Sequence, residues 1–130
     1  MNIDDIAPFP NPGVNLLKED EHVAIWEEVF VPGVPTPPHR HLRDYIAIFP
    51  DGGELTVTHV AGELESYSII AGKIEPLPNN SGGYRVGISA NAMLHSSVPH
   101  VGAGHIAVNE GDVPVRMILI ELKGSSSEKP

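Results

Sequence analysis

The 130-residue sequence contains no cysteine, which excludes disulfide bonds, thiolate metal ligands and cysteine nucleophiles. Lysines and arginines together number only eight. The resulting formal net charge of -9 argues against nucleic-acid binding through phosphate neutralisation. No apolar run approaches the length of a membrane span. The first thirteen residues, MNIDDIAPFPNPG, lack the basic and apolar regions of a secretory signal. We therefore expect a cytoplasmic protein without nucleic-acid or membrane partners.

Several enzyme motifs are also missing. The sequence contains no P-loop, no G-x-G-x-x-G, no G-x-S-x-G and no H-E-x-x-H, so it gives no support to a nucleotide-binding protein, a serine hydrolase or a zincin. Apolar residues do not recur with helical spacing over ten residues, which predicts no substantial helix. Thirteen glycines and thirteen prolines are instead typical of many short strands and turns.

Alternation of apolar and polar residues predicts seven to nine short strands in a sandwich or barrel. The expected strands are Glu21–Val31, Asp44–Phe49, Glu54–Val60, Ser66–Ile70, Lys73–Pro76, Tyr84–Ser89, His105–Asn109 and Val113–Leu122. The turn PDGG at residues 50–53 predicts a hairpin between the second and third of these strands. The turn at 111–112 predicts a last hairpin, and residues 90–104 show no clear pattern.

His39 and His41 lie two residues apart in front of an apolar run. In an extended strand, residues i and i+2 point to the same face, so both imidazoles are directed to one place. Imidazole is a common ligand of zinc, iron, nickel and copper. The pattern therefore indicates a metal site, and the alternative is a pair of partly exposed histidines at a barrel mouth.

Two motifs resemble those of the cupin family. The first family motif reads G-x5-H-x-H-x3,4-E-x6-G, and the sequence matches it at Gly33, His39, His41 and Gly53. The second motif reads roughly P-x-G-x2-H-x3-N. The sequence matches it at Gly102, His105 and Asn109, with Pro99 one position further from the glycine than the pattern asks. The resemblance covers about residues 20–122, and the run HRHLRDY is similar to that of small single-domain bacterial cupins.

The resemblance implies an all-β fold, the cupin double-stranded β-helix or jelly-roll barrel. It further implies one divalent transition metal, Fe, Mn, Ni or Zn, held by His39, His41 and His105. We expect three regions: an N-terminal arm at residues 1–19, a single cupin barrel domain at 20–123 and a flexible tail at 124–130. The family often forms dimers, so we expect a homodimer in which the proline-rich arm takes part.

The sequence departs from the family at the glutamate of the first motif, which would fall on Tyr45 or Ile46. Residues 44, 46 and 48 share one face of a strand, so an inward Ile46 would bring Asp44 inward as a fourth ligand. Asp44 would otherwise lie at the rim and bond Arg40 or Arg43. Tyr45, a candidate pocket residue whose phenol would contact a substrate, would by the same alternation face outward.

Four other residues complete the set of candidates. His59 shares one strand face with Leu55 and Val57, which makes it a candidate pocket residue. His95 and His100 precede His105 at five-residue steps and are candidates for substitute ligands or proton-transfer groups, or else loop histidines. Asn109 is expected to be structural, with its amide bonding the backbone near a turn.

The leading functional hypothesis is a metal-dependent cupin enzyme of the dioxygenase, isomerase or lyase type. Its substrate would be a small polar acid or sugar derivative, because a barrel interior is a narrow pocket lined by alternate strand residues. The missing glutamate motivates the alternative, a non-enzymatic cupin that binds a small ligand with weak or no metal. The sequence alone does not choose between the two.

Overall fold

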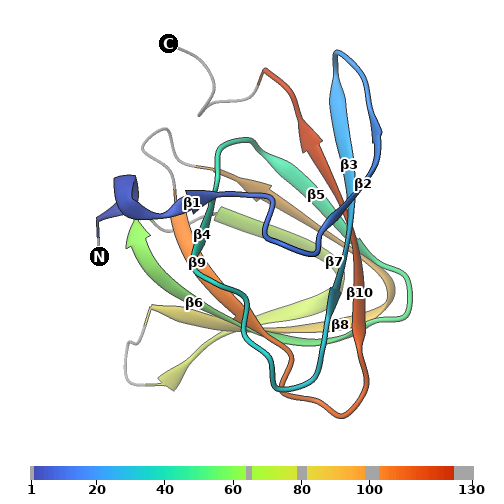
Figure 1. Cartoon of the computed structure of the whole chain (residues 1–130). Helices are drawn as coiled ribbons and strands as arrows, with labels where there is room; N and C mark the ends of the chain where they lie inside the picture. The colour runs from blue at the N-terminus through green and yellow to red at the C-terminus, as the bar shows by residue number, and fades with distance from the viewer. Residues whose placement is uncertain (1, 64–65, 79–81, 99–102, 125–130) are drawn as a thin grey trace.

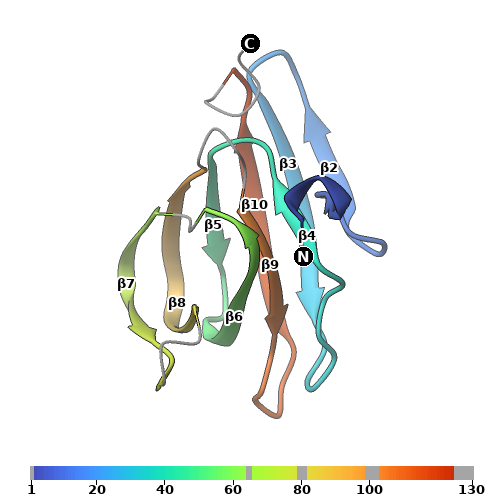
Figure 2. The ribbon, with the colours of Figure 1, turned by 90° about the vertical axis from the view of Figure 1, so that its left-hand side faces the viewer.

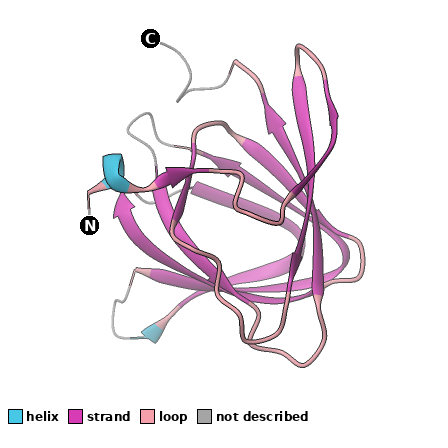
Figure 3. Cartoon of the chain, viewed as in Figure 1, coloured by secondary structure: helices cyan, strands magenta, loops and turns pink. Residues whose placement is uncertain are grey.

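The computed structural model describes residues 2–63, 66–78, 82–98 and 103–124. Most of these residues belong to β-strands (Figure 3). A short 3-10 helix, η1 (Ile3–Asp5), precedes the first strand, and no α-helix occurs in the described ranges, which confirms that prediction. None of the helices in this part of the chain has the length and apolar character needed to cross a bilayer.

The described residues form ten strands. They are β1 (Ala7–Pro8), β2 (Asn15–Glu19), β3 (Val23–Phe30), β4 (His39–His41), β5 (Tyr45–Phe49), β6 (Gly53–Gly62), β7 (Ser66–Pro76), β8 (Gly83–Ser97), β9 (Ala103–Val108) and β10 (Val115–Leu122). The sheet order is β1-β4-β9-β6-β8-β5-β10-β3-β2, and β7 pairs with β8 outside this path. The strands curl around an interior, as Figure 1 shows, and the predicted all-β jelly-roll barrel is confirmed.

The long strand β8 connects the two sides of the barrel. Residues 83–88 pair with β6, residues 92–96 pair with β5, and β7 runs along the other edge of both segments. Asn91, between the two segments, has a φ of 63°, a left-handed conformation that asparagine tolerates better than most residues. The sheet bends around this strand, and Figure 2 shows β7, β8, β5 and β6 gathered on one side of the molecule.

Both predicted hairpins are wrong. β5 pairs with β8 and β10, whereas β6 pairs with β8 and β9, so the turn at residues 50–53 leads from one part of the sheet to another. Likewise β10 pairs with β3 and β5, and not with β9. A turn sequence determines a local chain reversal, but in this barrel the strand after the turn finds its partners far away in the chain.

Two predicted strands are one element in the structure. Ser66–Ile70 and Lys73–Pro76 are joined in β7, which continues through a register shift between Ile70 and Gly72. Ala71 has a φ of 62° at this shift, as expected of the extra residue in a bulge. The unassigned residues 90–97 also prove to be strand, because they form the second half of β8.

The apolar core fills the interior of the barrel. Alternate residues of β5 and β10 face inward and are buried, including Tyr45, Ala47 and Phe49 on β5 and Met117 and Leu119 on β10. This alternation is the period of two that a strand imposes on its side chains.

One polar cluster is buried on the same inner face. The indole Nε1 of Trp26 donates a hydrogen bond of 2.7 Å to Oε1 of Glu121, and the guanidinium of Arg43 lies 3.6 Å from the same carboxylate oxygen. We call these three residues the Glu121 cluster. The negative charge of the Glu121 carboxylate is compensated within the chain by the Trp26 N–H donor and the Arg43 cation.

The first nineteen residues contribute to the sheet at two places. β1 pairs in parallel with β4, and β2 pairs with β3. The segment between β1 and β2 crosses the opening of the barrel in Figure 1. Phe9 of this segment is buried and packs edge to face on Trp26, with ring centroids 5.6 Å apart. The division into an arm (1–19), a barrel (20–123) and a tail (124–130) stays a prediction, and residues 125–130 lie outside the described ranges.

Candidate metal centre

Three histidines meet inside the barrel. His39 and His41 are the ends of β4, and His39 is the register partner of His105 on the antiparallel strand β9. Directly opposed residues point to the same face of a sheet, and so do residues i and i+2 of one strand. All three side chains therefore face inward and are buried. Their candidate ligand nitrogens all lie within 4.8 Å of one another.

The three imidazole rings form T-shaped or tilted pairs and are not stacked face to face. The centroid of His105 lies 4.5 Å from that of His39 and 5.1 Å from that of His41, and the two rings of β4 are 5.2 Å apart. The His39 and His105 planes are nearly perpendicular, at 87°. Phe9 stacks on His41 with ring centroids 4.9 Å apart, so the N-terminal segment packs against this histidine.

The hydrogen bond of His39 suits a metal ligand. Its Nδ1 lies 2.9 Å from the backbone carbonyl oxygen of Pro37. Because a carbonyl oxygen only accepts, Nδ1 carries the proton and donates, and the lone pair resides on Nε2. Metal-binding histidines are oriented in this way by a partner on the second ring nitrogen. Three buried imidazoles within 4.8 Å thus fit a divalent transition metal such as zinc, iron, manganese or nickel.

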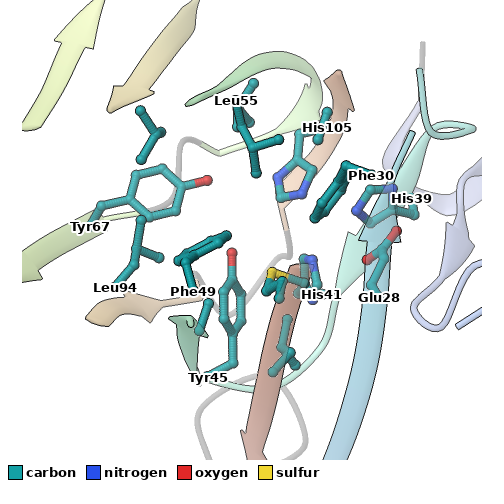
Figure 4. Close-up of a pocket in the computed structure, with 16 residues that line it drawn as sticks. Glu28, Phe30, His39, His41, Tyr45, Phe49, Leu55, Tyr67, Leu94 and His105 are labelled. Carbon is teal, nitrogen blue, oxygen red and sulfur yellow. The ribbon is translucent and has the colours of Figure 1, made fainter. Parts of the chain in front are cut away.

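A cavity of about 60 Å³ adjoins the histidines. Its wall is mainly aliphatic and aromatic, and Figure 4 shows Phe30, Phe49, Leu55 and Leu94 around it. Its polar groups are the three histidines, the phenols Tyr45 and Tyr67, and the carboxylate of Glu28. Among the described residues that line it, none is a lysine or an arginine. The cavity therefore has a candidate metal site at one side and an apolar wall at the other.

Glu28 is a site residue that the sequence reasoning missed. It lies on β3, is only 9% exposed, and lines the same cavity as the histidines. Figure 4 shows its carboxylate on the side of His39 and His41. Burial raises the pKa of Glu28, while the neighbouring Asn11 amide and the His105 imidazole act to lower it. The sequence pattern that could have located Glu28 is the alternation along β3. Ala24 and Phe30 lie an even number of residues away from Glu28, on the same face of the strand, and are also buried.

The alternation on β5 is the reverse of the assumed one. Tyr45, Ala47 and Phe49 are buried, and Ile46 and Ile48 lie on the opposite face. The inward Ile46 on which an inward Asp44 depended is not observed, and the prediction that Tyr45 faces outward is wrong. Tyr45 lines the cavity, and its ring centroid is 4.4 Å from that of His41.

Asp44 lies just before β5. Its Oδ1 accepts a hydrogen bond of 2.8 Å from the backbone N–H of Val98, and its own carbonyl oxygen accepts one from Leu122. The close group of candidate ligand atoms consists of the three histidines and does not include this carboxylate. The role of Asp44 as a fourth ligand stays a prediction.

The other candidate histidines of the described residues are not part of the close group of three. His59 faces His105 across β6 and β9, but its Nε2 lies 3.1 Å from the carbonyl oxygen of Gly62, and it lines a smaller, neighbouring cavity. His95 is exposed on the outer face of β8. His100 lies outside the described residues.

Asn109 has the structural role that was predicted. Its buried side-chain amide donates to the carbonyl oxygens of Phe30 (3.0 Å) and Val113 (2.7 Å), and its Oδ1 accepts from the backbone N–H of Gly111 (2.9 Å). These bonds tie the turn before β10 to the end of β3.

Comparison with known proteins gives different results for sequence and structure. No protein-family model matches the sequence, and no curated protein sequence is significantly similar to it. A cupin domain from Bordetella pertussis Tohama I superimposes with a TM-score of 0.60 and 21% identity, over 89% of this chain and 99% of that chain. A cupin superfamily protein from Desulfitobacterium hafniense DCB-2 gives a TM-score of 0.50 and 15% identity, over 88% and 81% of the two chains.

A third similar structure is oxalate decarboxylase from Bacillus subtilis, described with Mn(II) centres, with a TM-score of 0.52 and 15% identity. The match covers 92% of this chain but only 28% of the decarboxylase. Identities this low concern the fold and not the reaction. The curled all-β sheet, the inward histidines and these three likenesses agree with the two sequence motifs, and the chain therefore has the fold of the cupin superfamily.

Proposed function

We propose that the protein binds one divalent first-row metal through His39, His41 and His105 and acts on a small molecule in the adjoining cavity. The observation that carries the proposal is the meeting of three buried imidazoles within 4.8 Å, one of them oriented by a backbone carbonyl. Buried polar side chains that converge on one point of an otherwise apolar cavity are typical of a functional site. The Mn(II) centres of the oxalate decarboxylase support the view that this fold holds metals.

A bound metal would supply Lewis-acid polarisation of a ligand oxygen, or redox chemistry with O₂ in the case of Fe(II). The chain's own residues orient the ligand and exclude water. The aliphatic and aromatic wall is a surrounding of low polarity, which strengthens electrostatic interactions in the cavity. The Tyr45 hydroxyl group, on a ring that packs on His41, provides a hydrogen-bond donor for a ligand oxygen. Dioxygenation, isomerisation and lyase chemistry all agree with this arrangement.

The lining of the cavity favours a particular kind of ligand. A sugar has several hydroxyl groups, each of which needs a hydrogen-bond partner when it is buried. Away from the histidines, Glu28 and the two tyrosines, the described wall offers aliphatic and aromatic side chains and no cation for a free carboxylate. We therefore propose a small molecule with an apolar body and one or two oxygen atoms that reach the metal, in place of the sugar or polar acid expected from the sequence.

The test is a metal titration of a double variant, His39→Ala with His41→Ala. Stripped wild-type and variant proteins are titrated with Mn²⁺ and Zn²⁺ in a competition assay. We expect at least about a 100-fold loss of affinity, since two of three ligands are removed. His95→Ala, on the outer face, is the matched control and should bind like the wild type. A double variant that keeps its full metal complement while remaining folded by circular dichroism would contradict the proposal.

We also propose that the chain forms a homodimer. β2 is the last strand of the sheet order, so within the described residues one of its edges has no partner strand. Leu16 and Leu17 on this strand are 47% and 52% exposed. An open edge with exposed leucines favours association with a second copy. Light scattering during size-exclusion chromatography should give twice the chain mass, and a monomer mass would overturn this proposal.

A further inference from the structure

Glu28 is buried in the same cavity as the three histidines but is part of neither sequence motif. Its strand, β3, lies beside β10, where Met117 is the register partner of Glu28. Figure 4 shows the carboxylate directed to the side of His39 and His41, and His105 acts on it electrostatically. Four potential metal-ligating groups from β3, β4 and β9 therefore face one space.

A carboxylate buried at this place needs a positive charge. Removing an ionised carboxylate from water is costly unless it is paired with a cation or bound to a metal. In the described part of the chain, no lysine or arginine forms an ion pair with Glu28, and the groups that face it are imidazoles, an amide and apolar side chains. The carboxylate of Glu28 is thus buried beside three imidazoles and an amide, and no lysine or arginine of the described residues compensates its charge.

We propose that Glu28 is the carboxylate ligand of the metal held by His39, His41 and His105, which rests on the proposed function. Carboxylate oxygen together with imidazole nitrogen suits iron, manganese and zinc. The metal compensates the buried charge of Glu28, and Glu28 in turn lowers the net charge of the site. Its oxygens lie outside the 4.8 Å group of the histidines, so binding requires rotation about the side-chain bonds of Glu28.

The same strand provides a matched control. Glu27 is the preceding residue, lies on the opposite face of β3, and forms a 2.7 Å ion pair with the exposed Arg116. Glu27→Gln and Glu28→Gln thus make the same chemical change one residue apart, on the outside and the inside of the barrel. Glutamine is close to glutamate in shape, so both variants should fold, which circular dichroism checks.

The experiment measures metal affinity and ligand field on the full chain. Stripped wild type, Glu28→Gln and Glu27→Gln are titrated with Co²⁺, and the visible absorption spectrum is recorded together with the binding curve. We expect Glu28→Gln to lower the affinity at least about tenfold and to change the visible bands, because an anionic oxygen ligand is lost. Glu27→Gln should leave affinity and spectrum unchanged.

The outcomes separate this inference from the proposed function. If wild type and Glu28→Gln bind cobalt with equal affinity and identical bands, Glu28 is not a ligand, although the three-histidine site stands. A lower affinity with unchanged bands would also overturn the inference, because it would mean an effect at a distance. If wild type binds no cobalt at all, the proposed function and the inference both fail.

Discussion

The inner face of the barrel buries two glutamates in very different surroundings. Glu121, 5% exposed, accepts a hydrogen bond from the Trp26 indole and lies 3.6 Å from the Arg43 guanidinium. Glu28, 9% exposed, lies among three imidazoles, an amide and an apolar wall, without an ion pair to a lysine or arginine of the described chain. Glu121 and Glu28 are the same residue type and are similarly buried, but within the described residues only Glu121 of the two forms an ion pair with an arginine.

We interpret Glu121 as a structural carboxylate and propose a functional role for Glu28. The Glu121 cluster is complete within the chain, so it stabilises the fold and needs nothing further. Around Glu28 the described groups are imidazoles, an amide and apolar side chains, without a lysine or arginine. A divalent metal bound by the three histidines would compensate the charge of Glu28, as Arg43 compensates that of Glu121. If the two regions differ in this way, changes to them should have different effects on stability and on metal binding.

The largest effect is expected from breaking the Glu121 cluster. Glu121→Ala leaves the Trp26 N–H and the Arg43 guanidinium without their acceptor, and we expect the free energy of unfolding to fall by about 3 kcal/mol. Chemical denaturation followed by circular dichroism measures this change. Metal affinity should stay at the wild-type value. A variant that is as stable as the wild type, or that loses its metal, would remove the contrast between the regions.

Adding the metal should stabilise the histidine region. At a free metal concentration of about 100 times the dissociation constant, a ligand bound only by the folded state adds about 2.7 kcal/mol. Thermal unfolding with and without metal should show this shift in the wild type and in Glu121→Ala. The double variant His39→Ala with His41→Ala should show no shift, and a chelator should reverse the wild-type shift. Equal shifts in all three proteins would indicate binding elsewhere.

Glu28→Gln should change stability in the opposite direction from Glu121→Ala. Burial raises the pKa of Glu28 in the folded protein, so folding favours its protonated form. This contribution is present below the ordinary pKa of about 4.3 and is lost as the pH rises through the folded-state value. At neutral pH and without metal, the neutral glutamine should therefore raise the free energy of unfolding by about 1 kcal/mol.

The pH series provides the check on that sign. Urea unfolding of the metal-free proteins at several pH values should show the gain of Glu28→Gln shrinking as the pH falls toward the ordinary carboxyl range. A variant less stable than the wild type at neutral pH would mean that Glu28 is already compensated within the chain, like Glu121.

The smallest effect is expected outside the barrel. His95 is exposed on the outer face of β8, so His95→Ala should change the free energy of unfolding by less than about 0.5 kcal/mol. The same variant should bind metal like the wild type, as judged by the competition titration. Loss of metal here would mean that the site extends beyond the three buried histidines.

Local sequence patterns predicted the strands but not their partners. Alternation located β3, β5 and β10 to within about two residues, because it reflects a property of each strand alone. The partners of β5 are β8 and β10, both far away in the chain, and no turn residue carries that information. The hairpin expected after residue 49 was wrong for this reason.

The site was predicted only in part. The spacing of His39 and His41 and the second motif around His105 indicated the three histidines that the structure brings together. The orientation of β5 was wrong because its run YIAIF is apolar on both faces, so alternation does not say which face is inside. Glu28 was missed because a charged side chain on an inner face contradicts the usual rule that acids lie outside.

The metal content of the purified protein tests the proposed metal centre most directly. The protein, produced without a histidine tag and without added metal, is analysed by mass spectrometry for iron, manganese, nickel and zinc. We predict close to one equivalent of one metal per chain, with iron pointing to O₂ chemistry and zinc to Lewis-acid catalysis. A content well below one equivalent, with none regained when the protein is titrated with these metals, would contradict the proposed metal centre.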